Sequence, residues 1–252
     1  MKHCLSAVSL LLLLTIISCT SHTEVYKDAN APIEERVNDL VRRMTIDEKI
    51  GQLLCPLGWP MYEKSADGVQ PSELFRKRMD EAPIGGFWAV LRADPWTQKT
   101  LETGLNPEQS ALALNALQRY AVEHTRLGIP ILFAEETPHG HMAIGTTVFP
   151  TALGQASTFD ADLMRRMGET MGREVRLQGA HVGYGPVVDI AREPRWSRME
   201  ETFGEDPVLT GILATAIVKG MQGDSIADGE HVFSTLKHFA AYGIPQGGLN
   251  GE

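Results

Sequence analysis

Positive charge is scarce in this sequence. Its 252 residues include 23 Lys and Arg against 32 Asp and Glu, a formal net charge of −9. Residues 1–18 contain Lys2 and no acidic residue, so the remaining 234 residues carry 22 basic and 32 acidic side chains, a net charge of −10. Nucleic acid binds basic surfaces, so we predict no nucleic-acid partner. An acidic surface does not repel a neutral ligand such as a sugar.

The sequence also lacks an apolar run of about 20 residues, the length that spans a bilayer as a helix. The mainly apolar stretch from Leu5 to Ile17 follows Lys2, a pattern typical of a signal peptide. It ends in I-I-S-C, which resembles the bacterial lipobox. We therefore predict removal of residues 1–18 and a diacylglycerol anchor on Cys19, which would attach the protein to a lipid bilayer. The alternative is a signal peptide that is cleaved without lipidation.

Residues 19–32 are polar and unpatterned, which predicts a tether. The protein is then an exported bacterial lipoprotein, periplasmic or associated with the outer membrane. Cysteine is rare in this chain: Cys4 leaves with the signal peptide, Cys19 takes the lipid, and Cys55 alone is left. No intramolecular disulfide is therefore expected in the mature protein. Cys55 follows Leu53 and Leu54 and is predicted to be a small buried side chain.

Apolar residues at helical spacing alternate with short apolar runs, which predicts an α/β fold with a parallel sheet. Thr45 with Glu48 forms a capping box, and Asn106 precedes a second clear helix. The predicted helices are Glu34–Met44, a helix from Thr45, Pro107–Leu127, Asp160–Gln178 and Pro207–Gln222. The predicted strands are Gly85–Leu91, Ile129–Ala134, Ala180–Ile190 and Val232–Ala240. No repeat interrupts this pattern, so one domain is expected after the tether.

Charged residues gather where two of these strands end. The run R-E-P-R-W-S-R-M-E-E-T-F-G-E-D-P from Arg192 follows the third strand candidate, and Lys237 with His238 closes the fourth, which is predicted to be buried. A turn holds this many charged side chains only if they form ion pairs with one another or face a polar ligand. Ligands of parallel α/β folds bind at the carboxyl ends of the strands, so these residues predict a polar binding site.

Six segments, in this order, resemble the amino-terminal domain of glycoside hydrolase family 3, which comprises exo-acting β-glucosidases and β-xylosidases. They are V-N-D-L-V-R-R-M-T-I-D-E-K-I-G-Q-L, I-P-I-L-F-A-E-E-T-P-H-G, V-F-P-T-A-L-G-Q-A-S, the arginine-rich run, K-H-F-A-A-Y-G and G-G-L-N-G. The segments cover nearly everything after residue 33, which argues against chance. The resemblance implies an exo-acting β-glycosidase that hydrolyses O-glycosyl bonds with retention and binds a β-linked oligosaccharide or glycoside.

The resemblance also implies a fold. The family's domain is a (β/α)8 TIM-type barrel, which needs roughly 250 residues. Residues 33–252 offer about four strand-helix units, so we expect a partial, truncated barrel. In the family the nucleophile lies on a later strand and the acid/base in a following domain. We therefore expect a fragment without turnover, in which no catalytic residue is assigned. A lipid-anchored carbohydrate-binding protein without catalysis is the alternative.

The family pattern assigns four residues to sugar binding. Glu136 stands where a carboxylate grips hydroxyls of the non-reducing sugar, and Arg198 where a guanidinium donates to them. Lys237 and His238 match the lysine and histidine that bond the same sugar. Many glucosidases of the family carry Asp at the position of Glu136. The longer side chain reaches toward the C6 group of a hexose, which keeps xylose as a candidate.

Three further residues are expected to support these four: His139, Arg195 and Glu201. Each of the sugar-binding residues also has a purely structural interpretation, such as a salt bridge at a strand end. No cofactor and no metal are expected, because His139, His141 and Glu135 lack a further ligand at metal-like spacing.

The aromatic residues near these segments bear on two alternatives. Trp88, Trp96 and Trp196 are predicted to be packing residues, with Trp88 also placed to stack on a sugar. A β-N-acetylhexosaminidase of the same family would need a histidine where this sequence has Tyr242, which argues against that activity.

Overall fold

The computed structural model describes residues 24–239 and 242–249. The predicted signal peptide, Cys19, Ala240 and Ala241 of the fifth resemblance segment, and Asn250 and Gly251 of the sixth lie outside the described residues. The chain divides into two compact units, residues 1–49 and 50–252. Within the described residues, no helix has both the length and the apolar character needed to cross a membrane.

The first unit is helical. It contains the 3-10 helix η1 (Val25–Lys27), the helix α2 (Ile33–Arg43) and the start of α3 (Ile46–Gln52). Tyr26 is buried and its backbone N–H donates to Asp39 at 3.2 Å, so η1 packs against α2. The tether over residues 19–32 stays a prediction. The capping box is confirmed, since Thr45 N–H donates to Glu48 at 2.8 Å and Glu48 N–H donates to Thr45 at 3.2 Å.

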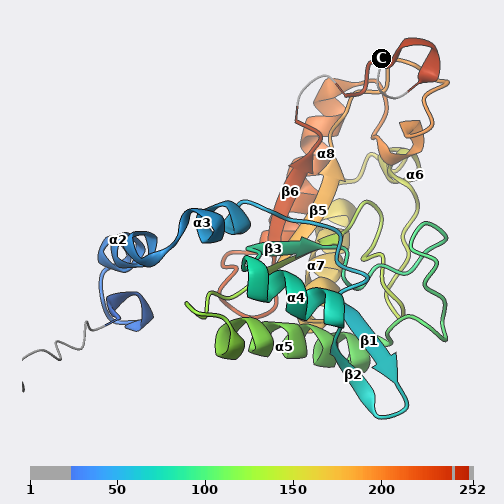
Figure 1. The fold of residues 1–252 in the computed structure, drawn as a ribbon. Helices are drawn as coiled ribbons and strands as arrows, with labels where there is room; N and C mark the ends of the chain where they lie inside the picture. The colour runs from blue at the N-terminus through green and yellow to red at the C-terminus, as the bar shows by residue number, and fades with distance from the viewer. Residues whose placement is uncertain (1–23, 240–241, 250–252) are drawn as a thin grey trace, which may run out of the picture. The chain divides into compact units, whose positions relative to one another are not determined.

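The second unit is built on a four-stranded parallel sheet, which confirms the predicted α/β class. Its strands β3 (Gly86–Trp88), β4 (Leu132–Glu136), β5 (Val182–Val187) and β6 (Phe233–Lys237) lie side by side in chain order (Figure 1). Residues 54–58 cover the outer edge of β3, where Trp88 N–H donates to Pro56 and Gly58 N–H donates to Trp88. Closure of such a sheet into a barrel stays a prediction, because four strands do not test it.

All four strands are shorter than predicted, and two of them differ in a further respect. The second begins three residues later and extends through Glu135 and Glu136, because Ile131 N–H donates to the Gln118 side chain at 2.7 Å rather than to a neighbouring strand. β6 is not buried as predicted, since Phe233 is 48% exposed and Leu236 55% exposed. Among the described residues β6 has a strand neighbour on one side only, so its apolar side chains are left partly uncovered.

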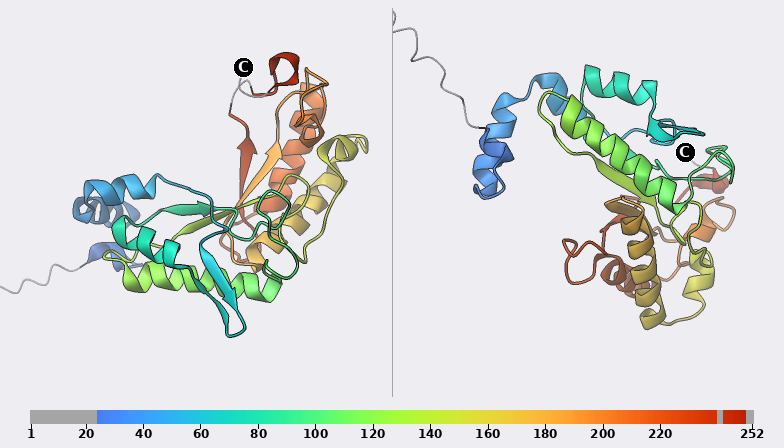
Figure 2. Two further views of the ribbon diagram at one scale, coloured as in Figure 1. Left: turned by 45° about the vertical axis from the view of Figure 1, so that its right-hand side comes forward. Right: turned by 90° about the horizontal axis from the view of Figure 1, so that it is seen from below.

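Helices separate the strands and lie against the sheet (Figure 2). They are α4 (Glu73–Glu81), α5 (Pro107–His124), α6 (Ala152–Ala156), α7 (Ala161–Leu177) and α8 (Pro207–Gln222), with short 3-10 turns at η2 (Met199–Glu201) and η3 (Gln246–Gly248). Asn106, Asp160 and Asp206 accept hydrogen bonds from first-turn N–H groups of α5, α7 and α8. The hairpin of β1 (Tyr62–Ser65) and β2 (Gly68–Pro71) and the helix α4 were not predicted.

One continuous apolar core joins the helices to the sheet. Its fully buried side chains come from the helices, the strands and the loops between them, and include Phe75, Phe87, Phe133, Met171 and Ile217. Burying a side chain of this size contributes about 1.5–3 kcal/mol. The helices therefore occupy the face of the sheet that Phe87 and Phe133 present, and the side chains of Trp88 and Glu136 are left for the other face.

The helices α7 and α8 approach each other unusually closely, and glycine makes this possible. A Cβ at Gly220 of α8 would lie 2.1 Å from the Arg165 carbonyl oxygen, and one at Gly168 of α7 would lie 2.4 Å from the Ile217 carbonyl oxygen. The obstructing atoms are backbone, so no side-chain rotation relieves the clash. These helices also pack on β5 and β6, so their spacing fixes the strands that carry much of the site described below.

We expect Gly220→Ala to lower the free energy of unfolding by about 2 kcal/mol or more, because it forces α7 and α8 apart. Gly211→Ala on the same helix is the matched control, since a Cβ there meets nothing within 4 Å. Alanine should stabilise that position by up to about 1 kcal/mol through helix propensity. Urea unfolding followed by circular dichroism measures both, and equal effects of the two substitutions would contradict the close contact.

Candidate functional site

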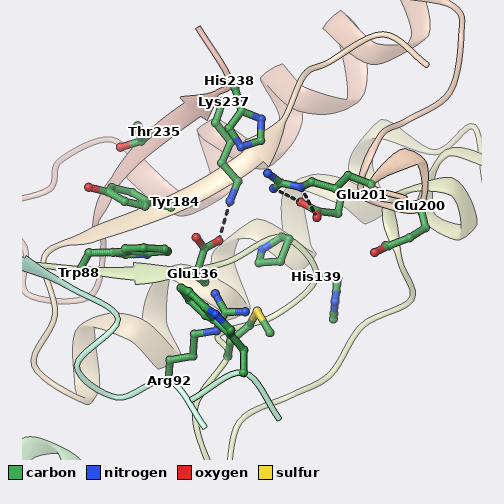
Figure 3. Close-up of a pocket in the computed structure, with 14 residues that line it drawn as sticks. Trp88, Arg92, Glu136, His139, Tyr184, Glu200, Glu201, Thr235, Lys237 and His238 are labelled. Atoms are coloured by element: carbon green, nitrogen blue, oxygen red, sulfur yellow. Dashed lines mark hydrogen bonds and ion pairs between the residues drawn. The ribbon is translucent and has the colours of Figure 1, made fainter. Parts of the chain in front are cut away.

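A cavity of about 640 Å³ opens at the carboxyl ends of the four parallel strands. Its volume lies within the range of small-molecule sites. The lining side chains come from every strand of the sheet and from the loops that follow, and include Trp88, Arg92, Trp96, Glu136, His139, Met142, Tyr184, Arg198, Glu200, Glu201, Thr235, Lys237 and His238 (Figure 3). The structure thus brings all four predicted sugar-binding residues to one cavity.

Glu136 and Lys237 form the innermost ion pair of the cavity. Lys237 Nζ donates to Glu136 Oε2 at 2.6 Å, and the two side chains are 13% and 8% exposed. Sheet register explains the meeting, because Glu136 lies opposite Tyr184, Tyr184 opposite Thr235, and Lys237 follows two residues later on the same face. The pair leaves carboxylate lone pairs and ammonium hydrogens free for a polar ligand.

Arg198 is held by a two-point contact. Its Nε and Nη2 donate to the two carboxylate oxygens of Glu201, each at 2.6 Å, and Nη1 donates to the Tyr242 hydroxyl at 3.3 Å. These hydrogen bonds raise the pKa of Arg198 further above its usual range. Burial is the largest influence on Glu201 and opposes its ionisation, but the hydrogen bonds from Arg198 together with the nearby positive charges outweigh it and lower the pKa of that carboxyl. The guanidinium is therefore a fixed cation whose plane has a set orientation.

His238 is oriented by Asp189. Its Nδ1 lies 2.7 Å from Asp189 Oδ2, and its backbone N–H donates to Asp189 Oδ1 at 3.3 Å. Asp189 is 6% exposed and follows β5, whereas His238 follows β6, so adjacent strands position the pair. Tyr242 packs against the imidazole with ring centroids 4.6 Å apart. The second ring nitrogen of His238 is then available to the cavity.

The three residues predicted to support the site have different places. Glu201 holds Arg198 and lines the cavity, and His139 lines it too. Arg195 does not line the cavity; it is 70% exposed and pairs with Glu193 at 2.8 Å. Hydrogen bonds from Arg195 lower the pKa of Glu193 to about 2. Arg195 thus braces the surface of the loop rather than the cavity.

Sequence reasoning missed Arg92 and underestimated Trp96. Arg92 forms an ion pair with Asp94 at 2.6 Å and lies over the Trp96 ring at 4.6 Å. Trp96 packs on Trp59 and Trp88, yet it is 54% exposed and faces the cavity. Arg92 and Trp96 both follow the first strand. Lys237 was found because charge at the carboxyl end of a strand indicates a binding site, and the same reasoning applied to Arg92.

Two buried ionisable groups lie beside the site in sequence. Glu135 is fully buried, and burial raises its pKa to about 8 even though its Oε1 accepts the Leu91 N–H at 3.0 Å. Burial also lowers the pKa of His141 to about 3. Neither ring nitrogen of His141, nor Glu135 Oε2, has a hydrogen-bond partner among the described residues. Both groups are therefore neutral near pH 7.

The described residues contain no cluster of three or more His, Cys, Asp or Glu side chains that could hold a metal ion. Cys55, predicted to be buried, is exposed, because the segment around it runs along the outside of β3. Its Sγ lies 3.6 Å from the Tyr184 hydroxyl. The chemistry that the cavity offers is thus a set of fixed donors and acceptors beside aromatic rings, which suits a neutral ligand rich in hydroxyl groups.

Comparison with known proteins identifies relatives over most of the sequence. The family described as "Glycosyl hydrolase family 3 N terminal domain" matches residues 45–251. A putative β-xylosidase of Formosa agariphila is 35% identical over 89% of this chain and 29% of its own length. A periplasmic β-glucosidase of Salmonella typhimurium is 37% identical over 84% of this chain and 24% of its own length. This chain therefore spans about a quarter to a third of these relatives.

Solved structures agree with the sequence comparison. A β-glucosidase from Erythrobacter marinus has a TM-score of 0.71 at 33% identity, covering 90% of this chain and 28% of the other. A β-glucosidase from Listeria innocua in complex with glucose has a TM-score of 0.67 at 31% identity, covering 86% of this chain and 28% of the other. The α/β arrangement described above is thus shared with β-glucosidases.

We expect Lys237→Met to lower the free energy of unfolding by about 3 kcal/mol, because it leaves the buried Glu136 carboxylate without its cation. Lys219→Met, which removes an exposed lysine of α8, should change it by less than about 0.5 kcal/mol. The double substitution Lys237→Met with Glu136→Gln should recover part of the loss, which a double-mutant cycle in urea measures. Equal unfolding curves for the two lysine variants would contradict a coupled pair.

Glu135 should make the protein less stable at about pH 8 than at about pH 5. Its folded pKa of about 8 exceeds the ordinary value of 4.5, so the folded state holds a proton that the unfolded state has lost. The free energy of unfolding should therefore fall as the pH rises from about 5 to about 8, by up to about 1.4 kcal/mol per pH unit from this group. Glu135→Gln keeps the Leu91 contact and removes the proton, so its stability should decline less. Parallel pH profiles of the two proteins would refute the neutral carboxyl.

Proposed function

This chain belongs to glycoside hydrolase family 3, and we propose that it forms the sugar-recognition part of an exo-acting, retaining β-glycosidase. The observation that carries the proposal is the convergence of Glu136, Lys237, Arg198 and His238 on one cavity, each held by a partner at 2.7 Å or less. The relatives named above are β-glucosidases and a putative β-xylosidase. Their activity supports a β-linked glycoside as ligand.

The arrangement fits a pyranose. A ring with adjacent hydroxyls needs donors and acceptors in fixed directions, and charged partners bond them more strongly than neutral ones. The carboxylate of Glu136 accepts from two hydroxyls, while the Lys237 ammonium and the Arg198 guanidinium donate to hydroxyl oxygens. Because each group is already held by its partner, little side-chain entropy is lost when a sugar binds.

Retaining hydrolysis needs two carboxyl groups about 5–5.5 Å apart, one as nucleophile and one as acid/base. Glu136 and Glu201 each bond to a cation at 2.6 Å, which suits them to hold hydroxyls rather than to attack the anomeric carbon. We therefore propose that the 252-residue chain binds a glycoside without turning it over. Residues 33–252 would form the first part of a (β/α)8 barrel, which the four parallel strands in chain order support.

Glu136 bears on whether the bound sugar is glucose or xylose. Glucose and xylose differ only by the C6 group, and the longer side chain of Glu136 projects toward that position in the proposed pose. Both sugars belong to the proposal, since the Dickeya chrysanthemi relative, 33% identical, is a periplasmic β-glucosidase/β-xylosidase. The names of the periplasmic relatives also support export, with Cys19 as the proposed lipid anchor.

A second candidate function is a lipid-anchored carbohydrate-binding protein without catalysis. The same observation favours it, because every paired residue of the cavity has a recognition role that needs no bond cleavage. The two functions share one ligand and differ in whether catalytic carboxyl groups join this site.

Methyl β-D-glucopyranoside and methyl β-D-xylopyranoside should bind the 252-residue chain, and titration calorimetry measures their affinity. Arg198→Lys, which keeps the charge but loses the planar fork, should weaken binding about tenfold or more, the cost of a lost charged hydrogen bond. Arg195→Lys in the same loop is the control and should bind within about twofold of the unsubstituted chain, because exposed ion pairs contribute little.

Two results would overturn the proposal. Absence of binding to both glycosides would exclude sugar recognition by this chain. Release of the aryl group from an aryl β-glucoside or β-xyloside by the purified chain would show that the chain does turn over a glycoside. An Arg195 variant that binds as weakly as the Arg198 variant would show that the loop, and not the guanidinium in the cavity, determines affinity.

A further inference from the structure

The ionic groups that line the cavity are nearly all compensated by a partner of opposite charge. Lys237 pairs with Glu136 at 2.6 Å, Arg198 with Glu201 at 2.6 Å, and Arg92 with Asp94 at 2.6 Å. His238 has Asp189 at 2.7 Å. These pairs are close and partly or wholly buried, so each presents little net field to a ligand.

Glu200 departs from this pattern. It lines the cavity from η2, directly between Met199 and the Glu201 that binds Arg198. Among the described residues its carboxylate makes no hydrogen bond and no ion pair. Figure 3 shows the side chain of Glu200 apart from the paired groups. Burial and the neighbouring Glu201 raise its pKa, and the charge of His139 partly opposes this.

The depth of the charged groups places Glu200 at the mouth of the cavity. The side chain of Glu136 is 8% exposed and that of Glu201 18% exposed, whereas Glu200 is exposed. A sugar seated on Glu136 and Lys237 therefore has its inner hydroxyls at the buried floor. Whatever is attached to the anomeric carbon of that sugar extends toward the exposed groups, among them Glu200.

We propose that Glu200 selects the aglycone of the bound glycoside: it accepts hydrogen bonds from aglycone hydroxyl or ammonium groups and disfavours aglycones that carry an anion. The inference rests on the proposed function, since it assumes that the sugar occupies the floor of the cavity. It adds the chemical class of the group beyond the sugar, a neutral or cationic one. Glycosides whose aglycone is a uronic acid or a sulfated sugar should accordingly bind weakly.

A purely structural role for Glu200 has weaker support. An acid in the first turn of a helix can favour the helix dipole, but η2 spans only three residues and its N-cap residue, Arg198, makes no capping hydrogen bond with its side chain. The adjacent Glu201 already holds the turn to Arg198. Glu200 thus lines the cavity with a carboxylate that no described protein group binds, and this carboxylate can accept hydrogen bonds from a ligand group at the cavity mouth.

Three phenyl β-D-glucopyranosides that differ at the para position test the proposal: 4-hydroxyphenyl, 4-carboxyphenyl and 4-(aminomethyl)phenyl. The chain should bind the carboxyphenyl glucoside at least about fivefold more weakly than the hydroxyphenyl one, since two like charges about 4 Å apart in water repel by about 1 kcal/mol. The aminomethyl compound should bind most tightly. Raising the salt from about 0.01 M to about 1 M shortens the Debye length from about 30 Å to about 3 Å and should compress these differences.

Glu200→Gln keeps the shape of the side chain and removes its charge, so the affinities for the three glucosides should converge. Glu205→Gln is the matched control, because it removes an equal charge from an exposed residue that does not line the cavity. It should keep the full discrimination. The inference fails if Glu200→Gln discriminates as strongly as Glu205→Gln, or if the unsubstituted chain binds the three glucosides equally.

These outcomes separate the inference from the proposed function. Binding of the hydroxyphenyl glucoside without discrimination by charge would overturn the role of Glu200 and leave sugar recognition standing. Failure of all three glucosides to bind would overturn both. Unfolding curves of the two glutamine variants confirm that each is folded at the temperature of the titration.

Discussion

The ion pair between Glu136 and Lys237 is the contact on which the site depends. Its partners lie 101 residues apart in the sequence and meet at 2.6 Å across β5. A buried pair of this kind costs desolvation and is stabilising only when geometry is good and further hydrogen bonds are available. The pair therefore constrains the strands on both sides of β5 to a particular register, and a polar ligand completes the hydrogen bonds that the protein leaves open.

That register in turn depends on how the helices cover the sheet. The glycines Gly168 and Gly220 let α7 and α8 approach to backbone contact, and both helices pack on β5. In β5 itself, a Cβ at Gly185 would lie 2.5 Å from the Thr137 carbonyl oxygen, so backbone also approaches backbone there, while a Cβ at Gly183 would meet the terminal methyl of the Met221 side chain. Tyr184 stands between these glycines and faces the cavity. Close backbone packing on one face thus fixes side-chain placement on the other.

The charges of the cavity show how one sheet edge holds many ions. Each cation meets a carboxylate from its own loop or, for Lys237, from the strand beyond β5, so that little net charge is left to repel or attract a neutral sugar. Glu200 is the exception among these lining groups, which makes it the place where the charge of a ligand can matter. The buried, neutral Glu135 behind the cavity adds no charge to it at neutral pH.

Much of this architecture was predictable from local sequence. The helix from Pro207 to Gln222 was predicted with both its ends, and the caps at Thr45 and Asn106 were found because capping involves residues three positions apart. Strand ends were less certain: Glu135 and Glu136 were expected after β4 but belong to it, since the strand's limits depend on its neighbours β3 and β5. The burial of Cys55 and of β6 was mispredicted for the same reason, because exposure depends on what covers a segment.

The sequence by itself determined the family, the alternation of strands and helices, and the residue types at the strand ends, because those follow from local periodicity and from motifs. Only the tertiary structure decided which charges meet. Arg195 and Arg198 are three residues apart and chemically alike, yet one pairs with Glu193 at the surface and the other with Glu201 in the cavity. Glu200 and Glu201 both line the cavity, but only Glu201 is paired among the described residues. These two arginine pairs are local in the sequence, yet which of them faces the cavity depends on contacts with distant segments, such as that of Arg198 with Tyr242, which spacing along the sequence does not contain.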